Sequence, residues 1–186
     1  MLEKKLLAGV PPLRYGDPSA VCYIGAAQRL LEALGETVGQ DELFALCGAG
    51  LCFPWGFGTC CDEVGIIPEI PTRTLAAFGY ESEYLTGGTL ADKSAVLAKI
   101  RASIDAGRPV IGFDITVKTP MACLIVGCDG NGLYTRAFRP PAGQRDDSAK
   151  PFYSADWHEN CAGLLFVGTK TGERLTGNAA YACVTD

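Results

Sequence analysis

The fold is decided by one stretch of this chain, Ser19-Ala20-Val21-Cys22-Tyr23-Ile24-Gly25-Ala26-Ala27-Gln28-Arg29-Leu30-Leu31-Glu32-Ala33-Leu34-Gly35. Its apolar residues recur at positions 21, 24, 27, 31 and 34, and this spacing predicts one amphipathic helix. Ser19 is the predicted N-cap of that helix and Gly35 its C-terminal stop. Cys22 therefore falls in the first helical turn.

Cys22 is the first candidate for a chemical function. In the first turn of a helix, unpaired backbone N–H groups and the positive end of the helix dipole stabilise a thiolate. We therefore predict that Cys22 is a nucleophile and that iodoacetamide alkylates it faster than the rest of the nine cysteines. The alternative is a small buried side chain that packs the helix against a sheet.

The rest of the chain changes from helical to strand periodicity. Further helices are predicted at 39–47, at 68–78 and from a capping box at 89–92 to residue 107, and strands at 81–85, 110–115, 122–128, 133–138 and 161–169. Residues 129–132 predict a hairpin turn, and 139–160 a long polar loop. Helices followed by an antiparallel sheet are typical of an α+β domain.

Length and composition limit the function classes. A chain of 186 residues suits one well-buried domain, predicted at 1–172, and 173–186 is predicted as a C-terminal tail that resembles the start of a helix. The net charge of −5 and the scattered basic residues exclude a nucleic-acid partner. No run approaches the ~20 apolar residues of a membrane span, and the N-terminus lacks the apolar core of a signal peptide. We expect a cytoplasmic protein with reduced cysteines and no membrane partner.

This order of elements resembles the papain-like cysteine peptidase fold. The matching residues are Cys22, Ala26 and Gly35 on the first helix, then 104–111, then 124–127 before the hairpin. The similarity is greatest to the branch of the bacteriocin-processing leader peptidases and of the N-terminal region of the butirosin-pathway acyltransferase. It implies an α+β, papain-like fold in which N-terminal helices pack on an antiparallel sheet, and it implies that Cys22 is the nucleophile.

The chain departs from this family at three catalytic positions. The resemblance places the general base, a histidine, at Met121, whose thioether cannot take up a proton. The acid or amide that orients the histidine should fall near Phe138 or Arg139, and the oxyanion glutamine at Gly16. The usual catalytic set therefore cannot be built at its usual places.

The single histidine of the chain is His158, within Asp156-Trp157-His158-Glu159. If it reaches the site from another element, it can serve as the base, with Asp156 or Glu159 setting its tautomer. An active enzyme then has His158 within hydrogen-bond reach of the Cys22 sulfur, directly or through one water. The alternative is a surface histidine in a polar loop.

Five residues are predicted to bind substrate: Phe53, Trp55, Met121, Cys123 and Trp157. In the related fold the glycine- and aromatic-rich segment after the second helix borders the cleft, so Phe53 and Trp55 could line an apolar pocket there. Cys123 is expected to share a strand face with Met121 and to face the same cleft. Such a lining suits an acyl or aromatic group better than proton transfer. The alternative for the aromatic segment is core and turn.

A zinc site made of Cys52, Cys60, Cys61 and His158 is a further alternative, because thiolate and imidazole are the usual zinc ligands. The spacing matches no zinc-binding pattern, and adjacent cysteines chelate poorly. The sequence therefore predicts neither a metal nor any other cofactor.

Three functions remain open. The first is a thiol hydrolase or acyltransferase that forms a thioester on Cys22 from a small amide or peptide-like substrate and passes the acyl group to an amine or to water. The second is a catalytically degenerate pseudoenzyme that binds a small molecule or peptide in the cleft. The third is an interaction domain with an exposed apolar patch near Tyr181 and Val184. The sequence leaves the oligomeric state open.

Overall fold

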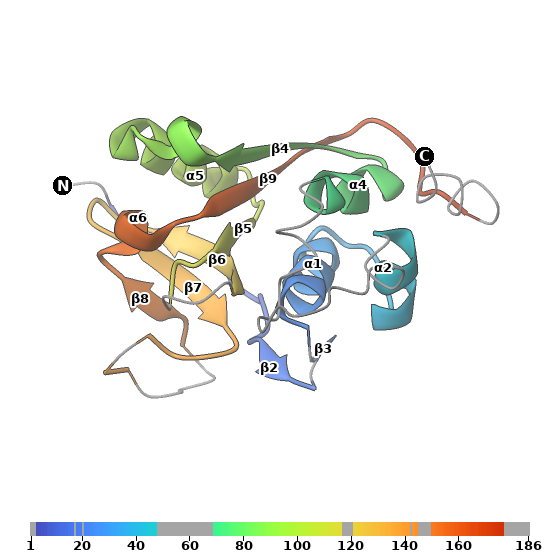
Figure 1. Cartoon of the computed structure of the whole chain (residues 1–186), viewed down its shortest axis with the longest axis horizontal. Coiled ribbons are helices and arrows are strands. Elements are labelled where there is room, and N and C mark those ends of the chain that lie inside the picture. Colours follow the sequence, from blue (N-terminus) through green and yellow to red (C-terminus); the bar gives the residue numbers. More distant parts are fainter. Residues whose placement is uncertain are drawn as a thin grey trace.

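A computed structural model describes residues 3–16, 18–19, 21–47, 69–116, 121–141, 143–144 and 150–176. It shows a main antiparallel sheet with helices on both faces and a small parallel pair of strands, β2 and β3 (Figure 1). The strands are β1 (Lys5–Leu6), β2 (Arg14–Tyr15), β3 (Pro18–Ser19), β4 (Tyr80–Thr86), β5 (Val110–Phe113), β6 (Ala122–Cys128), β7 (Leu133–Ala137), β8 (Phe152–Ser154) and β9 (Gly163–Lys170). The helices are α1 (Cys22–Ala33), α2 (Gln40–Leu46), α4 (Ile70–Ala77), the 3₁₀ turn η2 (Gly87–Leu90), α5 (Lys93–Asp105) and α6 (Trp157–Asn160). The predicted α+β class is confirmed.

The main sheet has the strand order β4-β9-β5-β6-β7-β8, with β1 also paired to β6, and all its pairs are antiparallel. Strand β6 is buried along its whole length, because elements cover both of its faces. Its residues therefore alternate between two separate cores.

The two faces of the sheet carry different helices (Figure 1). On the face that we call the α1 face, Ala122, Leu124 and Val126 join a core that also includes residues of α1, α2 and α4. On the α5 face, Cys123 and Ile125 join a second core with residues of α5 and α6. Neighbouring residues of one strand thus belong to different environments.

Gly127 shows why strand β1 can join the sheet. β5 pairs with β6 over Ala122 to Ile125, and β1 pairs with the next part of β6, at Gly127 and Cys128. A Cβ atom at Gly127 would overlap the carbonyl oxygen of Lys5. The close approach of these two backbones therefore requires glycine at this position.

Two predicted helix starts need correction. Helix α1 does begin at Cys22, but its N-cap is Val21, without a side-chain cap, while Ser19 belongs to β3. The capping box predicted at 89–92 is not formed: Thr89 is instead the N3 residue of a capping box whose N-cap is Thr86 and which serves η2. Helix α5 is capped by Asp92, whose carboxylate accepts hydrogen bonds from the backbone N–H groups of Ser94 and Ala95. Spacing alone does not tell which of two successive helices a cap serves.

Apart from small shifts at other element ends, two further regions differ from the sequence prediction. Strand β5 ends at Phe113 rather than at residue 115, because Asp114 adopts φ +62°, which breaks the strand. The predicted polar loop at 139–160 contains β8 and α6.

Of the predicted tail, residues 173–176 are described. There Arg174 pairs with Glu42, and the backbone N–H of Leu175 donates to the carbonyl of Ala77 at 2.8 Å. Residues 177–186, with the apolar patch expected near 181 and 184, lie outside the described residues.

Candidate active site

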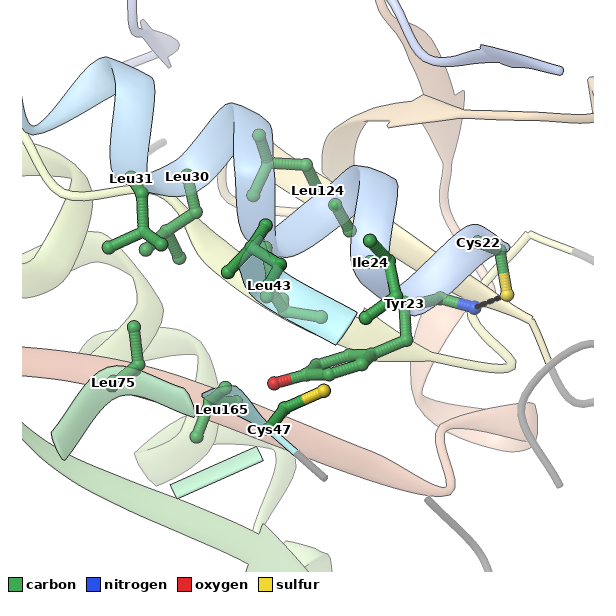
Figure 2. Packing of buried hydrophobic residues seen from close by; sticks show 14 of the residues in the cluster. Cys22, Tyr23, Ile24, Leu30, Leu31, Leu43, Cys47, Leu75, Leu124 and Leu165 are labelled. Carbon is green, nitrogen blue, oxygen red and sulfur yellow. Dashed lines mark hydrogen bonds between the residues drawn. The ribbon is translucent and has the colours of Figure 1, made fainter. Parts of the chain in front are cut away.

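Cys22 begins helix α1 and is completely buried on the α1 face of the sheet. Its Sγ accepts a hydrogen bond from the backbone N–H of Ala122, the first residue of β6, at 3.2 Å. Figure 2 shows Cys22 at the end of α1, beside the side chains that pack this helix on the sheet. The predicted position of Cys22, at a helix start facing the sheet, is confirmed.

Met121 lies directly beside this contact, since it precedes Ala122. It is 4% exposed and belongs to the same core as Cys22. Its backbone pairs with Asp114: the Met121 N–H donates to Asp114 Oδ1 at 2.9 Å, and the Asp114 N–H donates to the Met121 carbonyl at 3.1 Å. The position at which the family resemblance expects the histidine base is thus next to Cys22, and it holds a thioether, which is only a weak acceptor.

The structure does not bring His158 to Cys22. His158 lies on α6, where its Nε2–H donates to the Leu90 carbonyl at 2.6 Å and its ring meets that of Trp157 edge-on. Leu90 and Trp157 both belong to the core of the α5 face, whereas Cys22 belongs to that of the α1 face. The expected hydrogen bond between His158 and the Cys22 sulfur is therefore replaced by one to Leu90.

Cys123 and Trp157 also lie on the α5 face, and both are fully buried. The expectation that Cys123 shares a strand face with Met121 is wrong. Met121 precedes β6, so the alternation of the strand does not extend back to it. Burial raises the pKa of the Cys123 thiol, and the nearby Cys161 thiol adds to this effect.

The other residues predicted to bind substrate or zinc lie in segments outside the described residues. Phe53 and Trp55 lie outside the described residues, as do Cys52, Cys60 and Cys61 of the zinc alternative. Within the described ranges, no group of three or more His, Cys, Asp or Glu side chains is arranged to hold a metal ion.

Sequence reasoning missed an aromatic group beside Cys22. The ring of Tyr23 stacks on that of Phe113 at 6.2 Å, and Tyr84 meets Phe113 edge-on at 5.7 Å. The Tyr23 hydroxyl donates to Thr74 Oγ1 at 2.7 Å, and Thr74 donates to the Ile70 carbonyl at 2.8 Å. The sequence gives no signal for this group, because its members come from three distant segments.

Asp114 was also missed, since a positive φ at a non-glycine residue leaves no mark in the sequence. Its carboxylate affects the thiol of Cys161, the only described cysteine that is not fully buried. Burial raises the pKa of Cys161 to about 11, a backbone hydrogen bond with Gly163 opposes this shift, and the charge of Asp114 adds to it. At neutral pH Cys161 is therefore a thiol rather than a thiolate.

Comparison with solved structures identifies the fold. A crystal structure of a putative C39-like peptidase from Bacillus anthracis superposes with a TM-score of 0.54 at 15% identity, covering 90% of this chain and 99% of that chain. The peptidase domain of Streptococcus ComA, a bifunctional ABC transporter involved in a quorum-sensing pathway, superposes with a TM-score of 0.48 at 15% identity, covering 88% of this chain and 97% of that one. The sequence matches no family model and no curated protein.

The chain therefore has a papain-like cysteine peptidase fold, with N-terminal helices packed on an antiparallel sheet. Within that class it is similar to the C39-like peptidases. In the part of the chain that the structure describes, no helix has both the length and the apolar composition to cross a bilayer.

Proposed function

We propose that this chain is a catalytically degenerate, papain-like protein that binds a peptide or small molecule at the Cys22 end of α1 and does not cleave it. The observation that carries the proposal is the pair of neighbours of Cys22: Ala122, whose N–H donates to the sulfur, and Met121, at the position of the base. A papain-like thiol needs a base that takes its proton. The thioether of Met121 cannot fill this role.

The surroundings of His158 support the same proposal. Its ring nitrogen donates to Leu90, and its neighbour Trp157 is anchored in the core of the α5 face. Moving the imidazole to Cys22 would break that hydrogen bond and require displacement of a fully buried indole. We therefore assign His158 a structural role.

The proposed ligand carries an apolar or aromatic group. Met121, Phe113 and Tyr84 surround the start of β6 with sulfur and aromatic rings, and two of these three side chains belong to the α1-face core. Met121 and Phe113 are already buried, whereas Tyr84 is half-buried. An apolar ligand group that excludes water from the Tyr84 ring would stabilise the complex by about 25 cal/mol per Å² of apolar surface covered.

A second candidate is the thiol hydrolase or acyltransferase, favoured by one observation. Cys22 stands at the start of a helix, and its sulfur already accepts a backbone N–H, an arrangement that stabilises a thiolate. In this mechanism the sulfur attacks an amide carbonyl, and the thiol proton leaves with the amine. A thioester remains, and a second amine or water takes over the acyl group.

A paired-ligand experiment separates the two candidates. A peptide aldehyde forms a hemithioacetal with a reactive thiol, whereas the matching peptide alcohol cannot. A binding protein is expected to gain the same thermal stability from both, with no difference between the wild type and Cys22→Ala. Tighter binding of the aldehyde, lost in Cys22→Ala, would establish the enzyme, and no stabilisation by either peptide would refute peptide binding.

Substitution of Met121 tests the missing base directly. Met121→His is expected to raise the rate at which iodoacetamide alkylates Cys22 by at least ~10-fold, because an imidazole beside the sulfur stabilises its thiolate. Met121→Leu is the matched control and should leave the rate unchanged. Turnover of fluorogenic peptides by the wild type that disappears in Cys22→Ala would contradict the proposal.

A further inference from the structure

A groove of about 360 Å³ lies between helix α5 and the strands β4 and β9. We call it the α5 groove. It opens on the α5 face, and helix α1 with Cys22 packs on the opposite face. Neither the family resemblance nor the proposed function uses it. Its lining includes four charged residues, Glu81, Glu83, Lys99 and Arg108, and the apolar residues Ala102 and Phe166.

The floor of the α5 groove is apolar and made largely of small residues. Phe166 is 5% exposed and lies opposite Glu83 in the β4–β9 pairing. Ala102 and Gly168 line the groove beside it. A Cβ atom at Gly168 would come within 2.9 Å of the Cβ of Glu81. The groove thus exists because side chains are small or absent where α5 passes over the sheet edge.

One pair of charges in the groove is already neutralised. The ammonium group of Lys99 forms an ion pair with Glu83 and lies 5.2 Å from the centre of the Phe166 ring. These two charges of the groove lining are therefore already paired with each other.

The other two charges lining the groove have no partner of this kind. Among the residues that the structure describes, neither the half-buried guanidinium of Arg108 nor the exposed carboxylate of Glu81 takes part in a salt bridge or side-chain hydrogen bond. One cationic and one anionic group therefore stand unpaired beside the same apolar floor.

We propose that the α5 groove binds a free α-amino acid with a large apolar side chain. The carboxylate of the ligand would pair with Arg108, whose planar guanidinium suits bidentate contact with a carboxylate. Its ammonium group would pair with Glu81, and its side chain would cover Phe166 and Ala102.

Charge complementarity excludes simpler ligands. A purely anionic ligand would meet the unpaired Glu81, and a purely cationic one would meet Arg108, and each would leave one charge of the groove unpaired. An uncharged ligand would gain only the apolar contacts. A zwitterion with an apolar body is the class that satisfies both charges and the floor together.

Titration with three related probes tests the proposal. Phenylalanine carries both charges, 3-phenylpropanoate lacks the ammonium group, and phenethylamine lacks the carboxylate. Followed by NMR on the full chain, phenylalanine is expected to shift the amide signals around Ala102 and Gly168. It should bind at least ~10-fold more tightly than either analogue, because each analogue leaves one charge of the groove without a partner. Equal binding of all three probes, or no binding at millimolar concentration, overturns the proposal.

Three variants locate the site. Arg108→Gln removes the carboxylate partner, and Ala102→Leu fills the groove from an exposed helix position. Each should weaken phenylalanine binding at least ~10-fold. Arg14→Gln, which removes an exposed arginine on β2, is the control and should bind like the wild type. Unchanged affinity in both groove variants would refute the site.

The result is independent of the Cys22 site. Cys22→Ala should bind phenylalanine as the wild type does, because the sheet separates the two sites. Loss of phenylalanine binding in Cys22→Ala would show that the amino acid occupies the α1 face and would contradict the assignment to the α5 groove.

Discussion

Two threonines, one against each face of the sheet, are completely buried, and only one of them is hydrogen-bonded. On the α1 face, Thr74 is 0% exposed, accepts from the Tyr23 hydroxyl and donates to Ile70. On the α5 face, Thr135 is also 0% exposed, and its hydroxyl has no hydrogen-bond partner in the described part of the chain. Ser154 and the Trp157 indole N–H, on the same face, are in the same situation.

The difference indicates that burying a polar side chain does not by itself provide it with a hydrogen-bond partner. On the α1 face, hydrogen bonds from Tyr23 to Thr74 and from Thr74 to the Ile70 carbonyl link the start of α1 to α4. The α5 face buries polar groups in its core and carries the α5 groove with its unpaired charges. Of these two threonines, the one on the face that holds Cys22 is therefore the hydrogen-bonded one, although Gln28 Oε1 on α1 also lacks a partner among the described residues.

Core truncation on β6 should have the largest effect and tests whether both faces are true cores. Leu124 and Ile125 are neighbours on one strand, both 0% exposed, and point to opposite faces. Leu124→Ala and Ile125→Ala should each lower the free energy of unfolding by about 2–5 kcal/mol. Chemical denaturation measures both. A cost below ~1 kcal/mol for Ile125→Ala would show that the α5 face is loosely packed.

The two buried threonines give the most direct test of the comparison. Thr74→Val leaves the Tyr23 hydroxyl without its acceptor and should cost about 1–3 kcal/mol of unfolding free energy. Thr135→Val removes an unpaired buried hydroxyl and should be neutral or stabilising by up to about 1 kcal/mol. The same denaturation experiment measures both variants. Equal costs would mean that Thr135 has a hydrogen bond that the described residues do not provide.

Thiol reactivity compares the faces through Cys22 and Cys161. Cys22 is completely buried, and Cys161 is half-buried with a pKa of about 11. We expect iodoacetamide to modify Cys161 at least ~10-fold faster than Cys22 at pH 8, reversing the expectation from the sequence, because reaction requires access as well as a thiolate. The rate at Cys161 should keep rising as the pH approaches 11. Peptide mapping by mass spectrometry measures both sites, and faster labelling of Cys22 would restore the nucleophile hypothesis.

The smallest expected effect concerns an ion pair at the rim of the α1 face. Lys170 bonds to Glu36 at 2.5 Å and lowers the pKa of this carboxyl below its usual value of 4.5, and Tyr80 also donates to it. Because the folded pKa is the lower one, the stabilisation is complete above about pH 4.5 and is lost as the pH falls through the folded value.

Glu36→Gln should therefore flatten the acid side of the stability curve by less than about 1 kcal/mol, since Lys170 is 42% exposed and solvent screens the pair. The control is Glu83→Gln, which removes the more exposed pair with Lys99 on the α5 face. Acid titration monitored by circular dichroism measures the difference. An acid transition that is the same in wild type and Glu36→Gln would contradict the expectation.

Much of the fold could be predicted because its signals are local. The period of the apolar residues marks α1 and α5, and the apolar run at 122–128 marks the central strand. The hairpin turn after β6 follows from Asp129, whose carboxylate accepts the backbone N–H groups of Asn131 and Gly132. Boundaries set by a single unusual residue, such as the end of β5 at Asp114, were out of reach.

The candidate site was only partly predictable. Cys22 and Met121 could be placed beside each other because both match positions of one family pattern. The face of His158 could not be predicted, because α6 lies in a segment whose polar composition predicts a loop. The face of Cys123 could not be predicted either, because it depends on the residue at which β6 begins.

The sequence alone established that a thiol stands at the start of a helix, since residue identity and helical period are local properties, and the family resemblance added that the position expected for the base holds Met121. Only the tertiary structure decided that the sulfur is buried against Ala122, that His158 bonds to Leu90 on the other face, and that α5 leaves a charged groove beside β4. These facts depend on strand order and on the faces of the sheet, which arise from contacts between residues far apart in the chain.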